Sequence, residues 1–242
     1  MAVSKINHRS LREKNVFNNI AHRTALKILP RNLIDAVHRL QNYSYKKHRE
    51  RLINERNQQL VSSLLRKRCP ILLELGAGGR QIDGWTSADV TEDSDLVVDL
   101  TQPIPFPDNT VNQIYASHLL EHFQYSELVK LLGECYRILI NDGMLKVAVP
   151  DASIYLAAYF NGNDFDTEYY CRYKPGLNSN SRMDYVNYMA YMGGHHRYMF
   201  DKENLLLVLG TAGFKQIKLR EFDPLLDLQE RDYESIYAEG TK

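Results

Sequence analysis

The sequence predicts an α/β protein in which a seven-stranded sheet, mostly parallel with an antiparallel last strand, follows an N-terminal helical arm. Two patterns support this prediction. After residue 70, short apolar runs typical of buried strands alternate with amphipathic segments of helix length. Before residue 70, apolar residues recur at helical spacing and basic residues dominate. We therefore expect a basic helical arm over residues 1–68 and a sheet domain over residues 69–242.

The arm is predicted to be helical over residues 10–66, with Pro30 interrupting the pattern and Pro70 ending it. Its charge is one-sided, because residues 1–68 hold 16 Lys and Arg against 4 Asp and Glu. The remaining residues hold 14 Lys and Arg against 26 Asp and Glu. Such an arm either lies on the acidic domain or binds an anionic partner, which is a lipid surface or a nucleic acid.

Strands are expected at seven segments: residues 71–75, 85–89, 95–100, 112–117, 144–150, 214–222 and 233–240. Helices are expected at residues 119–139 and 202–212, the second capped by Asp201 and stopped by Gly213. Asn141-Asp142-Gly143 predicts a turn before the fifth strand. The alternation implies a parallel sheet covered on both faces, while the short last connection implies that the final two strands are antiparallel.

The composition excludes several classes of protein. With 44% apolar and 25% charged residues, the chain is neither disordered nor collagen-like. Three scattered cysteines without a C-x-x-C pair fit a reducing compartment better than a disulfide framework. No apolar run approaches the ~20 residues of a membrane span, and the N-terminus lacks the apolar core of a signal peptide. We expect a cytoplasmic protein with peripheral association at the inner leaflet.

Three successive strand ends carry polar or glycine-rich sequence. The first strand runs into Gly76-Ala77-Gly78-Gly79, and the next two end in Asp89 and Asp99. Glycines let a backbone approach a ligand closely, although Gln81 replaces the last glycine of the dinucleotide fingerprint. A carboxylate at Asp89 can accept both ribose hydroxyls. Because ligands of open parallel sheets bind outside the carboxyl ends of the strands, these residues together predict one nucleoside ligand.

In order and spacing, ELGAGG, GWTSADV, VVDLTQPIPFPDNTVNQIYASHLLEHF, ECYRILINDGMLKVAVPD and AGFKQIKL resemble class I S-adenosylmethionine-dependent methyltransferases, over roughly residues 70–242. The subgroup that the chain most resembles is type 11, including bacterial members associated with surface-polysaccharide synthesis. The resemblance implies a Rossmann-like sheet with S-adenosyl-L-methionine as cofactor. It also implies cofactor contacts from Gly76, Ala77, Gly78, Asp89, Asp99, Leu100 and Ser117.

The chain departs from the family pattern at two places. Asn112 opens the fourth strand, where the family usually has Asp. Only eight residues separate Gly76 from Trp85, whereas parallel crossovers usually need about a dozen or more. We therefore expect the helix of this crossover to be reduced to a turn.

A candidate base follows the fourth strand, in Ser117-His118-Leu119-Leu120-Glu121-His122. On a helix, His118 and His122 would be i,i+4 neighbours, with Glu121 on the same face. Histidine titrates near neutral pH and can remove a proton from a hydroxyl acceptor. We expect His118 to be the preferred base, with His122 or His195 assisting. In the alternative interpretation, these imidazoles pack or bond to the backbone behind the loop.

The same segment permits a metal site. His118-x-x-Glu121-His122, with His195-His196 downstream, partly resembles the E-x-x-E-H plus distant His of some methyltransferases that act on sugar or quinol hydroxyls and bind a divalent cation. The first ligand differs, so a divalent metal is not expected as a cofactor. A His/Glu cluster of this kind can nevertheless bind Zn²⁺ or a similar ion.

Residues 151–200 hold nine of the sixteen tyrosines, in the region where the family places substrate-specific insertions. Tyr185, Tyr188 and Met192 have helical spacing, which indicates core positions. The remaining tyrosines, with Asn178-Ser179-Asn180 and Gly193-Gly194-His195-His196, predict an adaptable lid. Aromatic rings with hydroxyl groups suit sugars or phenols.

The leading prediction is methyl transfer from S-adenosylmethionine to an oxygen of a sugar-containing or other small hydroxylated acceptor. RNA 2′-O-methylation and a cofactor-binding scaffold without catalysis are the alternatives. The chain lacks the N/D-P-P-Y/F motif of amino-methyltransferases and a Pro-Cys nucleophile. The expected partners are a small-molecule or glycan acceptor and an anionic membrane surface bound through residues 1–48, rather than nucleic acid. The oligomeric state is left open.

Overall fold

The computed structural model describes residues 30–162 and 180–242. Contacts divide the chain into two compact units, Met1–Asn54 and Glu55–Lys242, which are described separately. Within the described residues, no helix is both long enough and apolar enough to span a membrane.

Helix α2 (Arg31–Lys67) begins directly after Pro30 and ends in two basic residues before Pro70, as the sequence predicts. The division between the two units falls inside this helix, whereas the boundary expected from the sequence lies at its end. The described residues of the first unit expose apolar side chains among basic ones: Leu33, Leu40, Tyr43 and Tyr45. The predicted helical segment before Pro30 lies outside the described residues.

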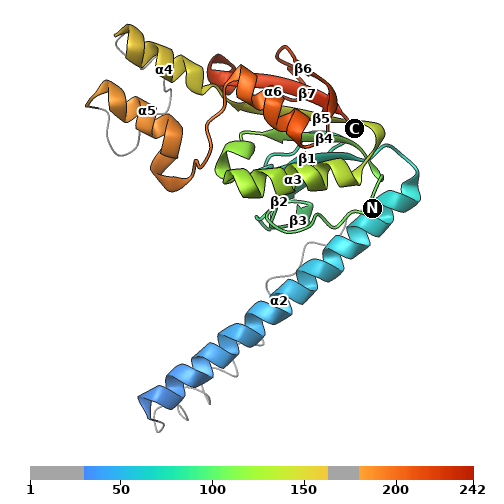
Figure 1. Ribbon diagram of the computed structural model, residues 1–242. Helices are drawn as coiled ribbons and strands as arrows, with labels where there is room; N and C mark the ends of the chain where they lie inside the picture. Colours follow the sequence, from blue (N-terminus) through green and yellow to red (C-terminus); the bar gives the residue numbers. More distant parts are fainter. Residues whose placement is uncertain (1–29, 163–179) are drawn as a thin grey trace. The chain divides into compact units, whose positions relative to one another are not determined.

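The second unit is built on the predicted seven-stranded sheet (Figure 1). Its strands are β1 (Leu72–Leu75), β2 (Thr86–Asp89), β3 (Leu96–Val97), β4 (Val111–Ser117), β5 (Leu139–Pro150), β6 (Lys215–Leu219) and β7 (Ser235–Thr241). The strand order is β3-β2-β1-β4-β5-β7-β6, and β7 alone runs antiparallel to its neighbours. The order in which strands are added to the sheet reverses at β1, whose neighbours β2 and β4 both run parallel to it, so the carboxyl ends of these three strands lie at one edge.

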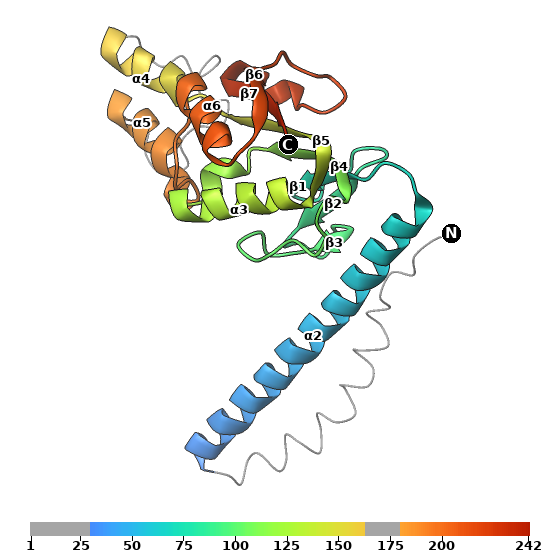
Figure 2. The same cartoon turned by 45° about the vertical axis from the view of Figure 1, so that its right-hand side comes forward.

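Two helices lie on the same face of the sheet, α3 (Tyr125–Ile138) and α6 (Lys202–Thr211) (Figures 1 and 2). Asp201 caps α6 through the Asn204 N–H at 2.7 Å, as predicted. The connections β1–β2, β2–β3 and β3–β4 contain no helix, so the expected reduction of the first crossover to a turn is confirmed. The predicted alternation of strand and helix therefore holds only for the second half of the sheet.

Two predicted boundaries are wrong. The helix expected over residues 119–139 is a short 3₁₀ turn, η1 (Leu120–His122), followed by α3, because Gln124 and Glu127 form a capping box that starts a new helix at Tyr125. The turn expected at residues 141–143 lies within β5. There the strand register shifts against β4, and Asp142 takes a φ of 61°.

The core is the apolar layer between the sheet and its helices, and it contains residues from β1, β4, β5, α3 and α6. The second unit's part of α2 closes one edge of the sheet. Asn57, 4% exposed, donates to the Val97 carbonyl at 2.8 Å and accepts from the Val97 N–H at 3.2 Å. The Asn57 side chain thus makes the hydrogen bonds that a neighbouring strand would make with β3, and it shields the free edge of this strand.

Helices α4 (Ala152–Asn161) and α5 (Arg182–Tyr191) lie side by side beyond the carboxyl end of β5 (Figure 2). They share a small apolar cluster of their own, centred on Tyr155, Tyr185 and Met189. The core position predicted for Tyr185 is therefore confirmed, and Tyr188 packs partly buried against the same cluster. Residues 163–179, which include Asn178 and Ser179 of the predicted lid, lie outside the described residues.

Candidate functional site

The glycine-rich loop after β1 lies at the carboxyl edge of the sheet. Gly76 has a φ of 70°, and a Cβ there would lie 2.7 Å from Leu119 Cδ1, so both conformation and space require glycine. Gly78 and Gly79 also have positive φ, but the Cβ positions of both face open space. The loop therefore presents bare backbone with room for a ligand beside it.

The two predicted aspartates lie at the ends of the next two strands: Asp89 is the last residue of β2, and Asp99 lies two residues beyond β3. Asp89 is half-buried, and its carboxylate accepts from the Gly78 N–H at 3.0 Å and from the Thr91 N–H at 3.1 Å. Each of these oxygens keeps a free lone pair, so the carboxylate can still accept from a ligand hydroxyl. Asp99 is exposed and accepts from the backbone and hydroxyl of Thr101, while the following Leu100 is buried. This arrangement fits a nucleoside lying across the strand ends.

A buried ion pair lies beneath the glycine-rich loop, and the sequence analysis did not assign it to the site. Glu74 is 3% exposed, its Oε1 lies 3.8 Å from Arg80 Nη1, and its Oε2 has no hydrogen-bond partner. Burial raises the pKa of Glu74 to about 7, although the Arg80 charge opposes this shift. An unpartnered buried carboxylate oxygen fits a ligand ammonium, such as that of the methionine part of the cofactor. A lone carboxylate in the apolar run ILLEL was the available signal.

The end of β4 carries the predicted histidine segment. Ser117 is the last residue of β4 and pairs with Ala148. His118 follows with a φ of 49°, and its side chain is 7% exposed. His118 Nε2 lies 2.9 Å from Ser235 Oγ, and its Nδ1 lies 3.6 Å from Glu121 Oε1. Burial lowers the pKa of His118 to about 3, so this imidazole is neutral and closely surrounded.

The prediction that His118, Glu121 and His122 share one helix face is wrong, because His118 precedes the 3₁₀ turn η1 in a left-handed conformation. Glu121 and His122 instead lie on η1, where they face a strap of chain formed by residues 195–198. The N–H groups of Arg197 and Tyr198 donate to the Glu121 carbonyl at 2.8 and 3.2 Å. These backbone bonds hold η1 against the strap.

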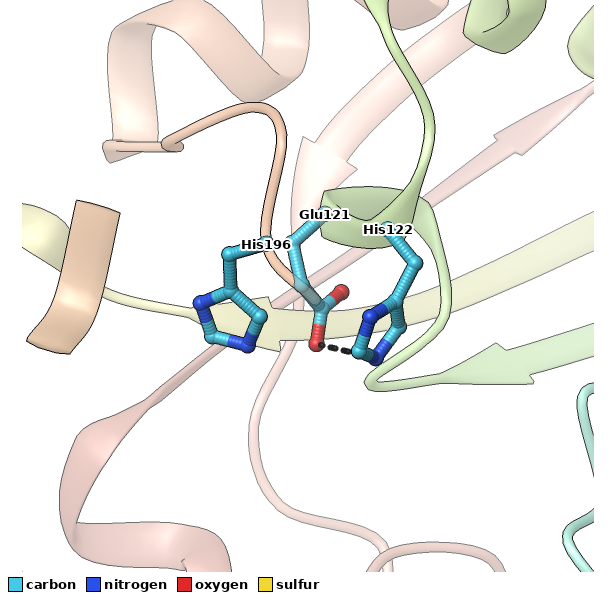
Figure 3. Close-up of side chains that lie close together, drawn as sticks. All are labelled: Glu121, His122 and His196. Atoms are coloured by element: carbon cyan, nitrogen blue, oxygen red, sulfur yellow. Dashed lines mark ion pairs between the residues drawn. The ribbon is translucent and has the colours of Figure 1, made fainter. Parts of the chain in front are cut away.

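The strap brings two further histidines to η1. It follows η2 (Met192–Gly194), in which Gly193 and Gly194 both have positive φ. His195 is exposed, and its carbonyl lies 2.9 Å from His122 Nδ1. His196 is 8% exposed, and its ring lies 5.3 Å from the ring of His122. Figure 3 shows the carboxylate of Glu121 between the imidazoles of His122 and His196.

The structure therefore brings the predicted residues together in two groups. The glycine-rich loop, Asp89 and Asp99 lie at the ends of β1, β2 and β3, and the histidines gather beyond β4. Of the two candidate bases that follow β4, His122 is the more accessible, since 38% of its side chain is exposed against 7% for His118. These surroundings favour His122 over His118 as the base, and the choice stays a prediction.

Part of the chain matches a known protein family. Residues 80–147, from the end of the glycine-rich loop to most of β5, match the family model described as a methyltransferase domain. No curated protein matches the chain.

Several solved structures are similar to this chain. A methyltransferase from Thermotoga maritima, described as a possible histamine N-methyltransferase, shares 15% identity over 85% of this chain and 99% of its own, with a TM-score of 0.45. One from Archaeoglobus fulgidus shares 16% over 76% of this chain and 94% of its own, with a TM-score of 0.44. Phosphoethanolamine N-methyltransferase 2 of Haemonchus contortus, solved with S-adenosylmethionine, shares 12% over 76% of this chain and 52% of its own, also at 0.44.

The family match and the strand order support the class predicted from the sequence. Residues 80–147 thus match a methyltransferase domain, and this match supports the prediction of a methyltransferase that has a Rossmann-like sheet and uses S-adenosylmethionine as cofactor. The glycine-rich loop and the lid helices lie outside the matched residues, so the roles of individual residues there are argued from the structure alone.

Proposed function

We propose that this protein transfers a methyl group from S-adenosylmethionine to an oxygen atom of a sugar-containing or other small hydroxylated acceptor. The observation that carries the proposal is the position of His122, an accessible imidazole one turn beyond Ser117 at the carboxyl end of β4. Transfer to a hydroxyl needs a group that takes up its proton, and an imidazole at this edge can do so.

The cofactor is proposed to lie across the strand ends, where it supplies an electrophilic methyl group on a sulfonium. Asp89 would accept the ribose hydroxyls, while Asp99 and Leu100 would border the adenine. Gly76, Ala77 and Gly78 would border the methionine part, with Glu74 beneath its ammonium and Ser117 near the sulfonium. Gly78 and Gly79 support this arrangement because a Cβ at either position would face open space rather than protein.

The histidine group is proposed to handle the proton. The carbonyl of His195 can only accept, so in the neutral tautomer that fits this contact His122 carries its proton on Nδ1 and leaves Nε2 as the bare acceptor. When an acceptor hydroxyl takes the methyl group from the bound cofactor, His122 Nε2 would take up the hydroxyl proton. The exposed His195 is placed to assist, and the buried His118 supports the fold of the turn.

The lid supports a sugar or phenol as acceptor. Its described residues expose large aromatic side chains, with Phe160 at 80% and Tyr191 at 62%. Exposed rings of this kind can stack on the apolar faces of a sugar, and Gly193 and Gly194 at the end of α5 provide a hinge. An acceptor used in surface-polysaccharide synthesis is consistent with these features.

The acceptor can be identified by mass spectrometry of surface glycans and lipids from host cells with and without this protein. We expect one species to lose the mass of a single methyl group when the protein is absent. Complementation with wild type should restore the species, and complementation with Asp89→Ala should restore it weakly. Unchanged glycans and lipids, with a methyl group lost instead from RNA, would overturn the proposed acceptor class.

The basic arm is proposed to bring the enzyme to lipid-linked acceptors at the inner leaflet of the cytoplasmic membrane. The described part of α2 supports this because Leu33, Leu40, Tyr43 and Tyr45 are exposed on a helix rich in Lys and Arg. Each Lys or Arg near an anionic surface contributes about 1 kcal/mol, and salt weakens the attraction.

Flotation with anionic vesicles tests the arm. The full chain should float at low salt and lose most of its binding at high salt, while a chain starting near Gln41 should stay at the bottom. If both remain unbound and the truncation changes the oligomeric mass instead, the arm is an assembly element.

A further inference from the structure

A buried carboxylate beyond β4 lacks the partners that its burial calls for. Glu121 is 2% exposed, and its Oε2 has no hydrogen-bond partner. Its Oε1 lies 3.6 Å from His118 Nδ1 and 3.9 Å from His122 Nε2, both longer than a hydrogen bond. A buried carboxylate normally pairs with a cation or neutralises itself, because leaving it charged and unpaired is costly.

Two imidazoles direct bare nitrogen atoms toward this carboxylate. His122 Nδ1 lies 2.9 Å from the carbonyl of His195, and His196 Nδ1 lies 2.8 Å from the carbonyl of Met189. A carbonyl can only accept, so each Nδ1 carries a proton, and in the neutral ring each Nε2 holds a lone pair. Histidines that bind metals in proteins are oriented in this way: one ring nitrogen donates to a backbone carbonyl, and the other faces the metal position.

The three side chains are held close together by the backbone. The ligand atoms of Glu121, His122 and His196 all lie within 4.8 Å of one another, with the carboxylate between the rings (Figure 3). The bonds from the strap to the Glu121 carbonyl fix this approach across the fold. Ligand atoms around a tetrahedral Zn²⁺ lie roughly 3.3 Å apart, so a closure of about 1.5 Å at the widest pair completes the geometry.

A third histidine offers a further donor. Ser235 donates its hydroxyl proton to the Arg231 carbonyl at 2.6 Å, so toward His118 its Oγ acts as the acceptor. His118 Nε2 must then carry the proton, which leaves its Nδ1 bare and facing Glu121. All three imidazoles thus turn an unprotonated nitrogen toward one carboxylate.

The charges around the cluster are mixed. Burial raises the pKa of Glu121 to about 8; the charge of Arg231 opposes this shift and the carboxylate of Glu234 adds to it. Burial also lowers the pKa of His196, so its ring is neutral. Neutral imidazoles with one carboxylate form the donor set of His₂Glu zinc sites.

We propose that Glu121, His122 and His196 form a binding site for a divalent transition-metal ion of the Zn²⁺ type, with His118 Nδ1 as an additional donor. Three protein ligands leave a coordination position free for an exogenous oxygen. A catalytic role for the ion rests on the proposed function. In that role, the exogenous oxygen is that of the acceptor hydroxyl. The ion would lower the pKa of this hydroxyl, whose proton would leave to solvent, and His122 would bind the ion in place of its proposed role as the base.

Metal binding is tested on the full chain, freed of metal by a chelator and titrated with Zn²⁺ by calorimetry in the absence of S-adenosylmethionine. We expect one ion per chain. Glu121→Gln and His122→Gln should each weaken binding by at least ~100-fold, since even outer-shell partners of metal ligands are worth 10–100-fold. His195→Gln is the matched control and should bind as wild type does, because only the backbone carbonyl of residue 195 contacts the cluster.

Co²⁺ provides a second measurement that does not depend on variant stability. Bound to this nitrogen and oxygen donor set, it should show visible absorption without the strong near-ultraviolet band of a cobalt–thiolate bond. Absence of stoichiometric binding, unchanged affinity in Glu121→Gln, or a thiolate band would overturn the site. In that case a protonated Glu121 that donates to one of the imidazoles explains the cluster.

The experiment separates this inference from the proposed function. Zn²⁺ binding is measured without cofactor or acceptor, so it stands even if methyl transfer to a hydroxyl is disproved. Conversely, if chelated enzyme methylates a hydroxyl acceptor at the full rate, the catalytic role of the ion is overturned while the proposed function holds.

Discussion

The two halves of the candidate site are assembled in different ways. The cofactor half consists of consecutive strand ends, Gly76–Gly79, Asp89 and Asp99, which the parallel sheet places along one edge. The histidine half joins η1 to a strap that lies 73 residues further along the chain, as the contact from His122 to the His195 carbonyl shows. The comparison teaches that a site built on neighbouring strand ends follows from strand order, whereas a site built across an insertion depends on how the insertion packs.

The largest expected effect lies in the histidine half. We expect His122→Ala to lower turnover by ~10²–10⁴, the usual contribution of a group that handles the proton. Cofactor binding should stay nearly intact, because His122 lies on η1 and outside the glycine-rich loop. Release of S-adenosylhomocysteine in the presence of the identified acceptor measures turnover, and calorimetry with S-adenosylmethionine measures binding.

His118→Ala is the matched variant for this prediction. It should mainly reduce thermal stability, because the buried ring contacts Ser235 and Glu121. A fully active His122→Ala together with an inactive but folded His118→Ala or His195→Ala would reverse the assignment of the base.

The next effect lies in the cofactor half. Asp89→Ala removes a charged acceptor for the ribose hydroxyls, and hydrogen bonds to charged groups contribute about 1.5–3 kcal/mol. We expect cofactor affinity to fall by roughly 10- to 150-fold, at about 1.4 kcal/mol per factor of ten. Calorimetry measures the change, with Asp93→Ala as a control acid on the same loop. Equal affinity in wild type and a folded Asp89→Ala would exclude the ribose contact.

A third effect concerns Glu74 and the pH dependence of stability. The pKa of Glu74 is raised by burial to about 7 in the folded protein, above its ordinary value of 4.5. Between these two pH values the folded state holds a proton that the unfolded state has lost, so stability falls as pH rises from 4.5 to 7. Glutamine does not ionise, so Glu74→Gln removes this pH-dependent loss of stability.

We expect the free energy of unfolding of Glu74→Gln, relative to wild type, to rise by about 2–3 kcal/mol between pH 4.5 and pH 8. Urea unfolding at several pH values measures it, and subtraction of the wild-type curve cancels the other carboxylates. A pH-independent difference would show that the pKa of Glu74 is the same in the folded and unfolded states.

The smallest effect is the difference in stability between alanine substitutions at two glycines of the loop. Gly78→Ala adds a Cβ that meets open space, so it should cost about 1–2 kcal/mol for the left-handed backbone alone. Gly76→Ala adds the same strain and also places its Cβ 2.7 Å from Leu119 Cδ1, so it should be the more destabilising of the two. Thermal unfolding of both variants tests the order, and equal losses would mean that Leu119 moves aside freely.

The strands that carry the cofactor half could be predicted from the sequence because their signals are local, and the cofactor contacts themselves stay a prediction. Period and length marked the strands, and Gly76, Asp89 and Asp99 directly follow or end them. Asp201 was readable as a helix cap for the same reason, since a cap needs only its own three following residues.

The residues of the histidine half could be identified from the sequence, but their arrangement in space could not be predicted. The pattern from His118 to His122 suggested one helix face, and the capping box at Gln124 broke that face by starting α3 later. His195 and His196 were visible as a pair, yet nothing local shows that one is exposed and the other points at Glu121.

By itself, the sequence determined the α/β class, the order of the strands along the chain and the acids near the strand ends, because these depend on short-range periodicity and on residue type. The class of enzyme was implied by the resemblance of its motifs to a known family. Only the tertiary structure decided that Glu74 and Glu121 are buried with unpartnered oxygens, and that the strap presents His196 to η1. Burial and the pairing of distant segments arise from packing of the whole chain, and packing alone places neutral imidazoles around a buried carboxylate.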